Sequence, residues 1–323
     1  MELRPTDALD RRAFLHASAA LLAASLAGSN ATAVRASKTP PFTTEIAPGV
    51  FVHRGQHSLF NPANAGDISN SGFVVGREAV AVIDTGGSAH VGAHLLAAVR
   101  AVTDKPIRYV VNTHMHPDHV FGNAPFEREG TTFAGHHKLA RGLQARADRY
   151  LGINKELLGA EAFEGTRVVF PTLAVHEAMM LDLGGRSLRL TPQKTAHTDN
   201  DLIVRDSATD TVFMGDLLFS EHVPTLDGSI RGWIALLNEL SAEPAQRVVP
   251  GHGPAAMAWP DAARPIQHYL EVVAMEVRTL IKENRTLSEA VSVVGMSEKS
   301  AWLLFDEYHA RNVSAAFAEL EWE

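Results

Sequence analysis

Three imidazoles and a carboxylate fall within six positions of this sequence: His114, His116, Asp118 and His119. They follow the apolar run 107–111, which predicts a β-strand that ends just before them. Because side chains alternate along a strand, His114 and His116 share one face of an extended backbone. Pro117 suits the first turn of a helix, from which Asp118 and His119 can point back toward the two histidines. Imidazole nitrogen and carboxylate oxygen together are ligands of a divalent metal ion, with zinc the leading candidate.

Four more motifs carry single candidate residues. Asp84 follows an apolar strand, and His197 stands alone between two strands. Asp216 belongs to a Gly-Asp pair after a strand, and His252 to a late Gly-His-Gly. With the H-x-H-x-D-H motif at 114–119, this ordered set resembles the metallo-β-lactamase-fold hydrolase superfamily over roughly residues 45–260. Within that superfamily the chain is similar to the quinoprotein relay system zinc metallohydrolases, on the stretches 66–70, 84–88 and 103–112.

The resemblance implies an α/β fold, the αββα metallo-β-lactamase sandwich, and a ligand set of seven residues. His114, His116 and His197 would hold one zinc ion, and Asp118, His119 and His252 would hold the other. Asp216 would bridge the two Zn²⁺ ions, and Asp118 is also the catalytic candidate. Asp84 is expected to position the ligands by hydrogen bonding without being a ligand itself. The alternative for Asp84 is a turn-forming residue at the end of its strand.

The implied activity is that of a binuclear zinc hydrolase, which uses a metal-bound hydroxide on a small ester, thioester or lactone-like substrate. Asp216 stands where the best-known zinc β-lactamases carry Cys or Ser, which favours a glyoxalase-II-type hydrolase, although lactam hydrolysis stays open. Two further alternatives are a mononuclear iron enzyme similar to the persulfide dioxygenases and a non-catalytic accessory of quinoprotein systems. The family resemblance also suggests a functional link to periplasmic quinoproteins.

Composition excludes several other classes of protein. A chain of 323 residues that is 46% hydrophobic and 20% charged can bury a sizeable core. The net charge of -8 disfavours nucleic acid as a partner, because phosphates need a basic surface. The absence of cysteine excludes disulfides, thiolate ligands and a cysteine nucleophile. A small molecule is the expected substrate.

The N-terminus predicts export. Residues 1–33 resemble a twin-arginine signal peptide, with Arg11 and Arg12 before the apolar run 17–27 and a small-x-small cleavage site that ends at Ala33. The run is too short and too rich in alanine for a stable membrane anchor. A linker is expected over 34–44, and the mature protein is expected in the periplasm. The alternative is an ordinary cytoplasmic N-terminus that is rich in alanine.

The remaining elements position these motifs. Strands are predicted at 50–53, 72–76 and 79–83, then a surface helix at 89–102, and the strands of a second sheet at 178–182, 186–191, 201–205, 211–214 and 247–249. The polar loop 56–70 is predicted to be either a flap over the metal site or a solvated loop. His136 and His137 are interpreted as surface or capping residues, and the region 136–165 is predicted to be helical. His222 and Arg231 could contact the substrate or lie on the surface. Residues 261–323 are predicted as a C-terminal helical extension with a capping box at 286–289, which packs on the sandwich or on a second subunit.

Overall fold

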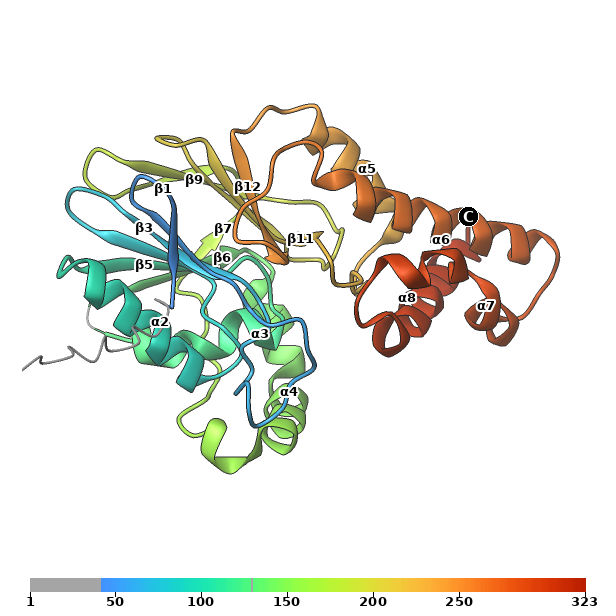
Figure 1. Cartoon of the computed structure of the whole chain (residues 1–323), viewed down its shortest axis with the longest axis horizontal. Coiled ribbons are helices and arrows are strands. Elements are labelled where there is room, and N and C mark those ends of the chain that lie inside the picture. Colours follow the sequence, from blue (N-terminus) through green and yellow to red (C-terminus); the bar gives the residue numbers. More distant parts are fainter. Residues whose placement is uncertain (1–41, 129) are drawn as a thin grey trace, which may run out of the picture. The chain divides into compact units, whose positions relative to one another are not determined.

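The computed structural model describes residues 42–128 and 130–323, and within them two β-sheets form the centre of the fold (Figure 1). The strands of the first sheet follow one another in chain order and are β1 (Thr44–Ala47), β2 (Val50–His53), β3 (Ser71–Val75), β4 (Val80–Ile83), β5 (Ile107–Val111), β6 (Thr132–His136) and β7 (Leu173–Val175). The second sheet has the order β12 (Arg247–His252), β11 (Thr211–Phe219), β10 (Leu202–Asp206), β9 (Ser187–Pro192) and β8 (Met179–Asp182).

Alternation of side chains along the strands creates the layers. In β4, Ala81 and Ile83 belong to the core between the two sheets, whereas Val80 and Val82 pack with helix α2 (Ala89–Val102) on the outer face. In the second sheet Phe213 lies in the core between the sheets, and its neighbours on either side along β11 face the core that includes α5 (Ile230–Ser241) and α6 (Ala263–Lys282). These layers confirm the predicted αββα sandwich.

Parallel pairing brings the candidate residues to one edge. Strands β4, β5 and β6 run parallel, and so do β11 and β12. Asp84 and the 114–119 motif therefore follow strand ends at the same edge of the first sheet, and the motif leads into the short helix α3 (Pro117–Val120) and the 3₁₀ turn η1 (Phe121–Phe126). Asp216 and His252 differ from expectation, because both strands are longer than predicted: Asp216 lies within β11 and His252 is the last residue of β12. The β11–β12 register is irregular around Gly215, whose φ of 52° turns the chain next to Asp216.

Two segments near the first sheet are more closely packed than predicted. Phe42, in the expected linker, stacks on His53 with ring centroids 3.7 Å apart, and β1 begins one residue before the expected domain boundary. The second half of the loop 56–70 is mostly buried, and Ser69 and Asn70 donate hydrogen bonds to the carbonyls of Asp118 and Pro250. This half of the loop is neither a free flap nor a solvated loop. The predicted signal peptide lies outside the described residues.

The helices confirm most of the helical segments predicted from the sequence. Helix α4 (Leu139–Ala162) follows His136, which is buried and accepts a hydrogen bond from the N–H of Lys138, while His137 is exposed. The C-terminal extension contains α6, α7 (Leu287–Val293), the 3₁₀ turn η2 (Met296–Ala301) and α8 (Phe305–Leu320), which share a hydrophobic core with β11 and α5. The capping box at Thr286 is present.

None of the helices in the described part of the chain has the length and hydropathy needed to cross a membrane.

Candidate metal centre

All seven predicted ligands meet at the edge where β5, β11 and β12 end. The residues form two groups. Each residue offers one nitrogen or oxygen atom, and within a group these atoms all lie within 4.8 Å of one another. The first group is made of His114, His116, His197 and Asp216, and the second of Asp118, His119 and His252. Most of these side chains are buried, which is unusual for imidazoles and carboxylates unless they are paired or bind a metal ion.

Each histidine has an inner ring nitrogen, which faces the other predicted ligands, and an outer ring nitrogen, which faces away from them. In the first group every outer nitrogen has a hydrogen-bond partner. His197 Nδ1 donates to the carbonyl of Thr225 at 2.7 Å, and His116 Nε2 donates to the carboxylate of Asp227 at 3.0 Å. Thr113 Oγ1 gives its proton to Asp84 at 2.7 Å, so at 3.1 Å it accepts the N–H of His114 Nδ1. These contacts fix the tautomer of all three rings.

The histidines of the second group are held in the same way. His119 Nδ1 donates to Asp84 Oδ2 at 2.8 Å, and His252 Nδ1 donates to the carbonyl of Ile68 at 2.9 Å. Asp84 also accepts the backbone N–H of Thr113 at 2.8 Å, so one buried carboxylate orients the start of the motif and its last histidine. This is the position that the resemblance implied for Asp84.

The seven predicted ligands form a cage, and the nitrogen and oxygen atoms that face its centre need a cation. In the first group, a neutral ring whose outer nitrogen donates carries a lone pair on its inner nitrogen, yet His116 Nδ1 and His197 Nε2 are only 2.9 Å apart. His119 Nε2 and Asp216 Oδ1 are buried and without a hydrogen-bond partner among the described residues. Such atoms lose free energy unless a positive charge lies between them. Nitrogen and oxygen donors in this number therefore fit divalent metal ions such as zinc.

Asp216 lies between the two groups. Its Oδ1 is 3.0 Å from His119 Nε2 in the second group, and its Oδ2 is 3.4 Å from His197 Nε2 and 3.7 Å from His114 Nε2 in the first. Oδ2 is also 3.5 Å from His252 Nε2. A carboxylate with both groups within reach has the geometry that a bridging ligand needs, although the bridging role stays a prediction.

The electrostatics of the two groups differ. Burial lowers the pKa of His197 to about 3 and holds the pKa of His114 well below its usual value, so these rings stay neutral. Burial also opposes protonation of His252, but the Asp216 and Asp118 carboxylates outweigh it and raise the pKa of His252 to about 9. The same carboxylates raise the pKa of His119.

The two predicted substrate contacts lie in other surroundings. Arg231 Nε pairs with Glu319 Oε1 of α8 at 3.0 Å. His222 is buried and packs beside the predicted ligand His252 with ring centroids 5.0 Å apart. The contact of either residue with a substrate stays a prediction. The side chains of the centre that keep some exposure are His116 at 14%, Asp118 at 13% and the neighbouring Asp227 at 16%, so the centre opens to solvent on their side.

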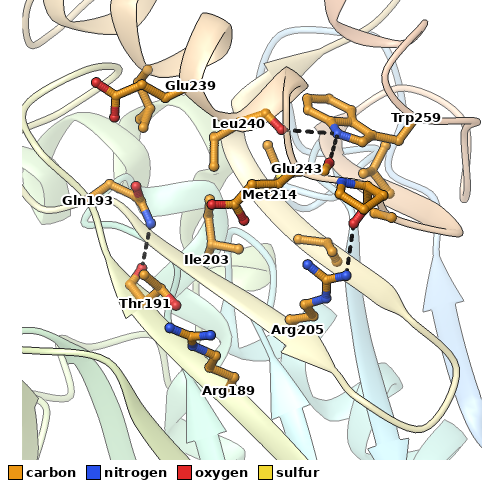
Figure 2. Close-up of a pocket in the computed structure, with 15 residues that line it drawn as sticks. Arg189, Thr191, Gln193, Ile203, Arg205, Met214, Glu239, Leu240, Glu243 and Trp259 are labelled. Atoms are coloured by element: carbon orange, nitrogen blue, oxygen red, sulfur yellow. Dashed lines mark hydrogen bonds between the residues drawn. The ribbon is translucent and has the colours of Figure 1, made fainter.

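A cavity of about 200 Å³ lies elsewhere, on the outer face of the five-stranded sheet (Figure 2). Met214 and Ile203 line it, and Trp259 forms a wall whose indole N–H donates to the carbonyls of Leu240 and Glu243. None of its lining residues is a predicted ligand.

Sequence reasoning missed most of the residues that hold the ligands. Asp227 was visible as an acid in the segment after Asp216, but nothing in its spacing linked it to His116. Burial would raise the pKa of Asp227, yet hydrogen bonds from His116 and Arg146 lower it below its usual value. Thr225 and Ile68 contribute backbone carbonyls, which carry no sequence signal.

Comparison with known proteins agrees with this geometry. The family model described as the metallo-beta-lactamase superfamily matches residues 64–252. A linear primary-alkylsulfatase from Pseudomonas sp. (strain ATCC 19151) is 40% identical over 58 residues, which are 18% of this chain and 11% of that protein. The chain thus spans about a tenth of the length of this curated relative.

Two solved structures share the fold. A metallo-beta-lactamase from Pontibacter korlensis matches with a TM-score of 0.57 at 19% identity, covering 71% of this chain and 98% of its own. A double mutant of the sec-alkyl sulfatase PisA1 matches with a TM-score of 0.61 at 13% identity, covering 77% of this chain and 44% of its own. At these identities the likeness is one of fold alone.

Proposed function

Because this chain belongs to the metallo-beta-lactamase superfamily, we propose that it is a metal-dependent hydrolase with two zinc ions per chain, acting on a small ester, thioester or lactone-like substrate. The observation that carries this proposal is the cage itself. Five imidazoles donate their outer N–H groups to fixed acceptors, and their inner nitrogens converge with two carboxylates. Such a preorganised donor set is what catalytic metal sites require.

The residues divide the work between binding and orientation. His114, His116 and His197 would hold one ion, and Asp118, His119 and His252 the other, with Asp216 shared. Zinc, when bound, supplies Lewis acidity that polarises a scissile group and lowers the pKa of a coordinated water. Asp118 is the catalytic candidate because its carboxylate lies at the open side of the centre, next to His116, where a substrate can enter. The buried Asp84 keeps His119 in the required tautomer.

Metal analysis and a substrate panel test this proposal together. We expect two equivalents of zinc per chain after native purification, and hydrolysis of at least one ester, thioester or lactone by the metal-loaded protein. One equivalent of iron without zinc would instead favour the enzyme similar to persulfide dioxygenases. A metal-loaded protein with no turnover on the whole panel, lactams included, would favour the non-catalytic accessory.

A sulfate ester is a second candidate substrate. Both an alkylsulfatase sequence and an alkyl sulfatase structure are similar to this chain, the first over a short stretch and the second in fold. Including a linear alkyl sulfate in the panel tests this candidate directly. Release of sulfate at a rate above that of the carboxylic ester would favour the sulfatase.

We also propose that the protein is exported to the periplasm by the twin-arginine route and serves quinoprotein-dependent oxidation there. The motif around Arg11 and Arg12 supports export, because the receptor reads this arginine pair. Replacing both with Lys should leave unprocessed precursor in the cytoplasm. Normal periplasmic accumulation of that variant would overturn the assignment.

A further inference from the structure

The segment 221–230, between β11 and α5, supplies the outer partners of two predicted ligands. The carbonyl of Thr225 accepts the Nδ1–H of His197, and the carboxylate of Asp227 accepts the Nε2–H of His116. The backbone N–H of Asp227 also donates to the carbonyl of His197 at 3.1 Å. The positions of these two imidazoles therefore depend on the position of the segment 221–230.

The C-terminal extension holds this segment along most of its length. Leu303, just before α8, donates its N–H to the carbonyl of Glu221 at 2.8 Å and accepts the N–H of Val223 at 3.0 Å. At the other end, the carboxylate of Glu319 accepts the Ser229 hydroxyl and the Ile230 N–H, both at 2.7 Å. These contacts join α8 to the two ends of the segment.

Asn312 of α8 makes the contact nearest to the ligand. Its Oδ1 accepts the N–H of Leu226 at 2.9 Å, and its Nδ2 donates to the carbonyl of Pro224 at 2.6 Å. These two residues are the immediate neighbours of Thr225, so the carboxamide bonds both sides of the residue that orients His197. Asn312 is itself buried, and its Nδ2 also approaches the hydroxyl of Tyr269 at 2.9 Å. A buried amide with all its groups paired fixes backbone position strongly.

We propose that Asn312 is a positioning residue of the metal centre, which sets the affinity of the first ligand group by fixing the Thr225 carbonyl against His197. The C-terminal extension is then a part of the centre as well as a packing element. This inference rests on the metal binding in the proposed function, and it is independent of the substrate and of hydrolysis. Changing a residue that orients a ligand typically lowers metal affinity by about 10–100-fold.

The test compares Asn312→Leu with Tyr269→Phe, a matched control that removes the hydroxyl next to Asn312 and leaves the contacts to Pro224 and Leu226 in place. The affinity of each site is measured with Co²⁺ by absorbance titration and chelator competition, on metal-free protein of known melting temperature. We expect Asn312→Leu to weaken the site of the first ligand group by about 10-fold or more and the site of the second by less than about 2-fold, with both sites unchanged in Tyr269→Phe.

Hydrogen exchange provides a second measurement that does not depend on metal. In metal-free Asn312→Leu, the amides of the segment 221–230 should exchange faster than in Tyr269→Phe, the Leu226 amide most of all. If Asn312→Leu does not fold, Asn312→Ser leaves room for water at the freed groups and should show the same selective loss, smaller in size. Equal affinities at both sites in the variant and the unaltered protein would overturn this inference alone. Failure of the unaltered protein to bind metal would overturn the proposed function with it.

Discussion

The two ligand groups of the candidate metal centre are supported by different parts of the molecule. In the second group, His119 and His252 donate to Asp84 and Ile68, which adjoin the strands of the first sheet. In the first group, His197 and His116 donate to the segment 221–230, which the C-terminal extension holds. The two groups therefore differ in most of their supports and share one, because Asp84 also holds Thr113, which accepts the N–H of His114 in the first group.

Because most of these supports differ, substitutions could adjust one predicted metal site of the sandwich with less change at the other. Asp84 directly follows β4, so strand pairing fixes its position, whereas Ile68 lies in the buried half of the loop 56–70, just before β3. Partners in a connecting segment depend on whatever packs against it. We therefore expect substitutions in the C-terminal extension to affect mainly metal affinity at the first group. Substitutions near β4 should affect mainly metal affinity at the second group.

The largest effect is expected at Asp216, the one ligand that both groups approach. Asp216→Asn keeps the size of the side chain and removes the charge that offsets the repulsion between two cations. We expect a folded protein with about one zinc per chain and hydrolysis reduced by at least about 100-fold. Metal analysis, thermal melting and turnover on the same preparation check this. Two zinc ions and full activity in the variant would show that Asp216 is not a bridge.

A crossed pair of substitutions tests the separate supports directly. Asp84→Asn should weaken mainly the second site and Asp227→Asn the first, each by about 10–100-fold, because an amide is a poorer acceptor for the imidazole N–H. Asp84→Asn should affect the first site less than the second, because Asp84 reaches His114 only through Thr113. Asn tolerates the φ of 53° at position 84, so backbone strain should not confuse the result. Co²⁺ titration of both variants is the measurement. Equal weakening of both sites in both variants would contradict separate supports.

A smaller effect is expected for the capping box of α7, which lies in the extension and whose hydrogen bonds join Thr286 and Glu289 to each other. Thr286→Ala removes the side-chain acceptor for the N–H of Glu289 and should lower the free energy of unfolding by about 1 kcal/mol. Denaturant unfolding measures that loss. Metal affinity should stay unchanged, because stability of the extension alone does not move the ligands. A selective loss of one ion would mean that general loosening reaches the centre.

The smallest effect is expected at Arg231. Its guanidinium pairs with Glu319 while the side chain stays 55% exposed, and exposed ion pairs contribute about 0.2–1 kcal/mol. Arg231→Gln should leave metal content, KM and kcat within about 2-fold of the unaltered protein, apart from this small loss of stability. A large rise in KM with unchanged kcat would instead support the substrate contact that the sequence suggested.

Short sequence patterns predict the candidate donor set and most of the elements. The spacing of His114, His116, Asp118 and His119 after an apolar run predicts a strand, a helical turn and a convergent donor set, and the structure brings all of them together. Helix α2, strand β5 and the capping box at Thr286 lie where local patterns placed them. These features are local, because hydrophobic period, proline position and capping residues act within a few positions.

Only the tertiary structure decided what supports the ligands. The carbonyls of Thr225 and Ile68 have no side-chain signature, and Asn312 lies 86 positions from Leu226, the residue that donates to it. The placement of Asp216 within β11 followed from pairing with β12, which local patterns do not encode. Contacts of this kind arise when distant segments pack to bury their apolar faces and must then pair every buried polar group. The types of the ligands are thus written in short motifs, whereas their orientation is a property of the whole fold.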